Sequence, residues 1–147
     1  MTPFCGGTIL TSRHILTAAH CTFNADTNDF KLPSSIQVLV GEHDTSDSVV
    51  DRRYVSEIRN HPKFTYENTD YDFSILTLLS SLIFSSIASP ICLPSSTLSQ
   101  FTDETATVIG WGLTSSYGIQ STTLQEVNVT VMENEHCKLY YDGKINK

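Results

Sequence analysis

Two places in the sequence combine residue types that can carry chemistry. In the first, His20 stands beside Cys21, and Cys5 precedes them. Histidine and cysteine can bind a metal together, but nothing supplies further ligands at a suitable spacing, so a metal site is the weakest interpretation. In the second, Asp72 opens an apolar strand, where a carboxylate is costly to bury unless it is hydrogen-bonded and faces a cation. Taken alone, the two would be a structural histidine and a strand-start cap.

The residues around His20 form a longer motif. Cys5–Leu10 reads Cys-Gly-Gly-Thr-Ile-Leu, and Leu16–Cys21 reads Leu-Thr-Ala-Ala-His-Cys. Both halves, at this spacing, resemble the first catalytic signature of the trypsin and chymotrypsin family. The resemblance implies that His20 is the catalytic histidine and that Cys5 and Cys21 form a disulfide clamping its loop. The glycines are expected to permit close backbone approach.

Asp70–Leu78 is similar to the family's strand that carries the catalytic aspartate. By this resemblance Asp72, and not Asp70, takes that role. Its carboxylate would receive the ring N–H of His20 and backbone N–H groups of Ala19 and His20, fix the tautomer and stabilise the imidazolium. Thr69 is expected near the subsite for the residue before the cleavage position. The other histidines match no catalytic position and are expected to have ordinary roles: His14, His43, His61 and His136.

The family's likeness continues through Gly110-Trp111-Gly112 and the segment from Thr123 to Cys137, so it covers nearly the whole chain. The fold it implies is all-β: a chymotrypsin-like double β-barrel with the N-terminal barrel largely present and the second barrel only begun. The domains expected are a six-stranded-type barrel carrying the catalytic histidine and aspartate over 1–95, an inter-barrel connection over 96–109 and the start of a C-terminal barrel over 110–147.

The pattern of short apolar runs separated by turn residues also indicates an all-β sandwich or barrel. Strands are predicted over 8–10, 15–16, 36–40, 54–58, 73–79, 105–109 and 127–131, and Asn134 is predicted to cap a short helix that runs to Tyr140. Residues 80–102 are rich in Ser and Thr. We expect them to form an ordered connection held by apolar anchors: Leu82, Ile83, Phe84, Ile87, Ile91 and Leu93.

Composition narrows the partners and the compartment. The 147 residues carry 9 Lys and Arg against 16 Asp and Glu, a net charge of −7, which disfavours nucleic acid and anionic membrane surfaces. No apolar run is long enough to span a membrane, and no signal peptide opens the chain. The resemblance implies an extracellular, disulfide-permissive compartment and a protein or peptide substrate.

Several family features are missing from the 147 residues. No Gly-Asp-Ser-Gly-Gly segment supplies the serine nucleophile and oxyanion loop, and no Ile-Val-Gly-Gly-like N-terminus occurs. By resemblance, Cys137 would pair with a cysteine beyond the end of the chain, and Cys92 would tether an upstream pro-segment or domain. We therefore expect an inactive piece of a secreted serine endopeptidase. The alternative is a non-catalytic, protease-like binding or regulatory protein, against which retention of His20 and Asp72 argues.

No cofactor or metal is expected. Glu42 matches a ligand of the calcium loop of trypsins, but Val49 and Arg52 stand where the other acidic ligands are usual, and calcium prefers several oxygen ligands. Asn128 opens a glycosylation sequon, but it lies in a predicted strand, and we expect it to be unused.

Overall fold

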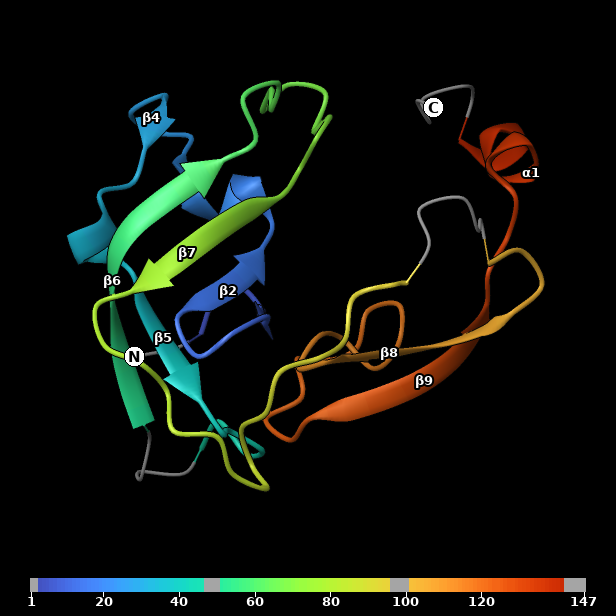
Figure 1. Ribbon diagram of the computed structural model, residues 1–147. Coiled ribbons are helices and arrows are strands. Elements are labelled where there is room, and N and C mark those ends of the chain that lie inside the picture. Colours follow the sequence, from blue (N-terminus) through green and yellow to red (C-terminus); the bar gives the residue numbers. More distant parts are fainter. Residues whose placement is uncertain (1–2, 47–50, 96–100, 142–147) are drawn as a thin grey trace. The chain divides into compact units, whose positions relative to one another are not determined.

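A computed structural model of the chain describes residues 3–46, 51–95 and 101–141. The chain divides into two compact units, Met1–Leu93 and Pro94–Lys147. Nearly all the regular structure is in strands (Figure 1), so the all-β prediction is confirmed. The division at 95 and 109 stays a prediction. Within the described residues, no helix is both long and apolar enough to cross a membrane.

The first unit is built on a five-stranded antiparallel sheet that curls around a small core (Figure 1). The strand order is β1 (Thr8–Ile9), β2 (His14–Thr17), β7 (Ser74–Leu78), β6 (Asp51–Asn60) and β5 (Gln37–Val40). The hairpin of β3 (Phe23–Asn24) and β4 (Asp29–Phe30) forms a separate small sheet. Two 3₁₀ turns, η1 (Ala19–Thr22) and η2 (Pro33–Ser35), connect these elements.

Strand β7 lies between β2 and β6 and shows why the sequence folds this way. Ser74, Leu76 and Leu78 are buried, whereas the residues between them are half-buried. This is the two-residue period of a strand with one face on the core. The second face is covered only in part. The core cluster consists of Ile15, Ile36, Val40, Val55, Leu76, Leu78 and Leu82.

The pairing of β2 with β7 is fixed at its far end by Arg13. The backbone N–H of Leu78 donates to the carbonyl of Arg13 over 2.8 Å. The Arg13 guanidinium returns two hydrogen bonds, of 2.9 and 3.2 Å, to the carbonyl of Leu78. A one-residue slip would turn every side chain of the strand to the other face, so these bonds help to set which residues meet at the opposite end.

The segment after β7 is held by fewer apolar anchors than predicted. Leu82 is buried, 5% exposed, and its backbone N–H donates to the carbonyl of Ser12 over 2.7 Å. Ser85 and Ala88 exchange two backbone hydrogen bonds, and Ala88 packs against the core. The other predicted anchors are exposed to solvent, and the prediction was wrong for Ile83, Phe84, Ile87, Ile91 and Leu93.

In the second unit, the described residues 101–141 form a two-stranded ribbon and one helix. β8 (Thr105–Gly110) pairs antiparallel with β9 (Gln125–Thr130) along its whole length. The predicted short helix is confirmed as α1 (Asn134–Tyr140), but Asn134 is its first residue and Glu133 precedes it as the cap position. None of the residues described in 101–141 is buried.

Candidate active site

The sheet register brings His20 and Asp72 together. β2 and β7 run antiparallel with Thr17 opposite Ser74, so the end of β2 and the beginning of β7 lie side by side. The chain leaves β2 directly into η1, which contains His20, and it enters β7 shortly after Asp72. Two residues that are far apart in sequence therefore meet at one edge of the same strand pair.

Asp72 contacts His20 at two points. Its Oδ2 lies 2.7 Å from Nδ1 of the His20 ring, and its Oδ1 accepts the backbone N–H of His20 over 2.8 Å. Using both carboxylate oxygens fixes the direction of the carboxylate as well as its distance. The structure thus juxtaposes the two residues in the arrangement that the resemblance implied.

The surroundings of Asp72 favour its charged form. Burial acts to raise the pKa of the carboxyl group. Hydrogen bonds from the ring and backbone of His20, attraction to that ring and a backbone N–H of Ala19 act in the opposite direction. They outweigh burial, and the net pKa of Asp72 lies below its usual value. A carboxylate rather than a carboxylic acid therefore faces the imidazole near neutral pH.

The hydrogen-bond pattern selects one tautomer of His20. A carboxylate only accepts hydrogen bonds, so Nδ1 must carry the proton and Nε2 of the neutral ring has a free lone pair. The Sγ of Cys21 lies 3.6 Å from Nε2, but as a disulfide sulfur it has no proton to donate. The His20 side chain is 48% exposed. Nε2 is thus available to accept a proton from another molecule or group.

A disulfide joins Cys5 to Cys21, as the resemblance implied, with a sequence separation of 16. Closing a loop of this length is worth roughly 3 kcal/mol in the chain-entropy model. A Cβ atom at Gly7 would lie 2.8 Å from Cγ2 of Ile15, so glycine is needed for this segment to lie against β2. Gly6 has no neighbour within 4 Å of such an atom, and the predicted close approach there was wrong.

The disulfide also determines whether Cys5, His20 and Cys21 could bind a metal ion. One ligand atom each from Cys5, His20 and Cys21 lie within 4.8 Å of one another. Thiolates, and not disulfide sulfurs, bind metal ions. The donor set therefore does not fit a metal ion while the bridge is closed.

Two residues that the sequence analysis did not select hold the segment of His20. Lys31 donates through Nζ to the carbonyl of Cys21 over 2.9 Å, and its ammonium group lies 4.3 Å from the ring centroid of Phe4. The buried hydroxyl of Thr22 lies 2.8 Å from the carbonyl of Ala19. No sequence signal marked these contacts, because they depend on the path of the chain after η1.

Of the remaining candidate residues, Thr69 makes a local hydrogen bond and the two other cysteines are free. Thr69 is exposed, and its hydroxyl donates to the carbonyl of Asn68 over 2.7 Å. Its role as a subsite wall stays a prediction. Cys92 is a free, exposed cysteine, and Cys137 is free and half-buried. Val49 of the expected calcium loop lies outside the described residues.

Comparison with known proteins decides the family. The family model described as "Trypsin" matches residues 2–147 of the chain. The chain belongs to the trypsin family. The relatives described next include serine proteases of this family. The resemblance to the trypsin and chymotrypsin family is therefore confirmed.

Three relatives illustrate the similarity of this trypsin-family chain. It is 34% identical to a venom serine protease of Polistes dominula over 97% of the chain and 51% of that protein. It is 32% identical to the proclotting enzyme of Tachypleus tridentatus, over 97% of the chain and 40% of that protein. It is 35% identical to Trypsin-1 of Astacus astacus, over 92% of the chain and 56% of that protein. The chain thus spans about half the length of the curated relatives it matches.

Proposed function

We propose that His20 and Asp72 are the general base and its orienting carboxylate in a secreted, serine-type endopeptidase that hydrolyses peptide bonds of protein substrates through an acyl-enzyme. The observation that carries the proposal is the two-point contact of Asp72 with the ring and backbone of His20, at 2.7 and 2.8 Å. Membership of the trypsin family supplies the reaction class.

In this proposal each group has a part in the reaction. Nε2 of His20 accepts the hydroxyl proton of the attacking serine and later returns it to the leaving amine. Asp72 keeps the proton on Nδ1 and stabilises the imidazolium that forms in between. The lowered pKa of Asp72 supports this part, because the carboxyl group stays ionised at neutral pH.

The serine nucleophile is the part that the 147 residues do not identify. No Gly-Asp-Ser-Gly-Gly segment occurs in them, and no serine in the described residues is hydrogen-bonded to the His20 ring. The chain by itself is therefore expected to hydrolyse no peptide bond. In this proposal the natural secreted protein carries the nucleophile on further sequence, and Cys92 tethers an upstream segment.

A fluorophosphonate probe, which labels activated serines, tests the proposal on the natural secreted protein that contains these residues and on the 147-residue chain. We expect labelling and casein hydrolysis by the first and neither by the second. In the active protein, His20→Ala should lower kcat/KM on the order of 10³-fold or more. His136→Ala, on the exposed helix α1, is the matched control and should change little. A secreted protein that ends at Lys147, or an active His20→Ala variant, would refute the proposal.

A further inference from the structure

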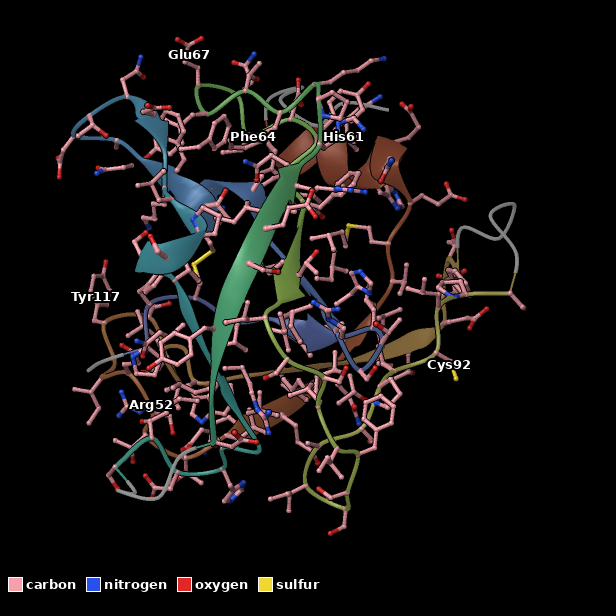
Figure 2. All side chains as sticks on the ribbon, turned by 60° about the vertical axis from the view of Figure 1, so that its left-hand side comes forward. Arg52, His61, Phe64, Glu67, Cys92 and Tyr117 are labelled. Carbon is pink, nitrogen blue, oxygen red and sulfur yellow. A yellow bond between two sulfur atoms is a disulfide. The ribbon has the colours of Figure 1, made fainter. Side chains whose placement is uncertain are left out.

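The end of strand β6 is held firmly beside the His20–Asp72 pair. Asn60, its last residue, is paired with Ser74 in the sheet. Its side-chain oxygen lies 2.8 Å from the hydroxyl of Thr22, in the same 3₁₀ turn as His20. The residue that follows, His61, therefore leaves the sheet from a fixed point (Figure 2, at the end of the central strand).

His61 contacts both sequence neighbours of Asp72. Its ring stacks on that of Tyr71, with centroids 4.6 Å apart and planes 10° from parallel, and packs at a tilt on Phe73 with the same centroid separation. Its backbone N–H donates to the carbonyl of Phe73 over 3.1 Å. The ring and the backbone of one residue thus hold the chain on both sides of the carboxylate.

The turn that carries Asp72 needs such a support. Tyr71 has a φ of 53°, in the left-handed region that bulky side chains avoid. The N–H of Phe73 donates to the carbonyl of Tyr71 over 2.7 Å, which closes a tight turn around Asp72. A backbone in this conformation persists only where its surroundings hold it. The stacked ring of His61 is a contact that would be lost if Tyr71 relaxed.

We infer that His61 is a positioning residue for Asp72: its ring clamps Tyr71 and Phe73 and thereby keeps the carboxylate within hydrogen-bond distance of Nδ1 of His20. The inference rests on the proposed function for its catalytic meaning, because it concerns the same pair. It does not depend on peptidase activity for its test, because the His20–Asp72 hydrogen bond can be observed directly. From sequence alone, His61 matches no catalytic position and was expected to have an ordinary role.

The test follows the Nδ1–H proton of His20 in the full 147-residue chain labelled with ¹⁵N-histidine, with the signal assigned by its loss in His20→Ala. The readout is the rate at which this proton exchanges with water. Without the stack, we expect His61→Ala to speed exchange about tenfold, the upper range for an aromatic pair. His61→Phe retains a ring for stacking and the backbone N–H, and it should stay within about threefold of the wild type. His136→Ala should leave the rate unchanged.

The backbone amide of Leu76, in the core of β7, is the internal reference. The inference holds if His61→Ala speeds exchange at Nδ1 of His20 but not at Leu76, and if His61→Phe restores the slow rate. It is overturned if both protons accelerate equally, since His61 would then only stabilise the fold, or if neither accelerates. A wild-type chain with no protected Nδ1–H signal would overturn the His20–Asp72 pair itself and with it the proposed function.

Discussion

His20 and Asp72 differ in solvent exposure, and the exposure of each side chain suits its proposed role. The His20 side chain is 48% exposed, which leaves Nε2 open to a reacting group. The Asp72 side chain is 24% exposed and turned towards the imidazole and the backbone of η1. The base is accessible, whereas the group that orients it is partly shielded from competing water.

The lowered pKa of Asp72 predicts a pH-dependent contribution to stability. A carboxyl group whose pKa is lower in the folded than in the unfolded chain stabilises the fold above its unfolded pKa. That contribution is lost as the pH falls through the folded pKa. Asp72→Asn should therefore lower the free energy of unfolding by about 1–2 kcal/mol at pH 7, and by less below about pH 4.

The unfolding transition of the first unit, followed by circular dichroism in urea at pH 7 and pH 3 for both proteins, measures this difference. Asp26→Asn is the matched control, since Asp26 is exposed in the turn between β3 and β4. An Asp72→Asn effect that is equal at both pH values would contradict the assigned cause of the shift.

At the scale of elements, Leu82 is the single residue that anchors the start of the connection after β7 to the core. Its side chain is 5% exposed, whereas that of its neighbour Ile83 is 86% exposed. Leu82→Ala should lower the free energy of unfolding by about 2–5 kcal/mol, because it leaves a cavity in the core. Ile83→Ala, an adjacent apolar truncation, should change it by less than about 0.5 kcal/mol. Urea titrations of the two variants test the difference, and equal losses would contradict the observed packing.

The comparison of Leu82 with Ile83 shows where prediction from sequence ends. The residue types around His20 and Asp72 formed a motif specific enough to predict the disulfide and the pair. The central strand followed from apolar patterning, since β7 buries every second residue on one face. The connection after β7 has no such period, so its composition could not show which apolar residue points inward. The backbone N–H of Leu82 is bound to the carbonyl of Ser12, a contact with a distant part of the chain that composition does not reveal.

The supports of the pair were missed for a related reason. Lys31 and His61 act through a backbone carbonyl and through stacked rings, respectively, and neither contact leaves a residue pattern in the chain. Their positions depend on the path of the hairpin β3–β4 and of the loop after β6. Such roles become visible only once the fold is known.

At the scale of the whole molecule, the two units differ in how much apolar surface they bury. The first unit has a core, whereas the ribbon of the second exposes apolar side chains: Val108, Ile109, Val127 and Val129. A two-stranded ribbon without a covered face is marginally stable in water, and its unpaired edges favour association. The 147-residue chain should therefore not unfold as one cooperative unit.

Brief digestion with proteinase K should show this difference. We expect cleavage first in the exposed turn between β8 and β9, and survival of a product close to Met1–Leu93. Mass spectrometry of the products identifies the cut sites, and digestion in denaturing urea is the control in which both units should be lost together. Equal resistance of the two units under native conditions would contradict the prediction.

The Cys5–Cys21 bridge also determines how the molecule transmits mechanical tension. A pull applied at the N-terminal side of Cys5 passes through the sulfur bond directly to Cys21, and it bypasses the hairpin of β1 and β2. The enclosed 16-residue separation, roughly 55 Å when extended, stays hidden from the force until the bond is reduced. Tension from any upstream attachment would thus arrive at the residue next to His20, where the bond from Lys31 to the carbonyl of Cys21 resists it.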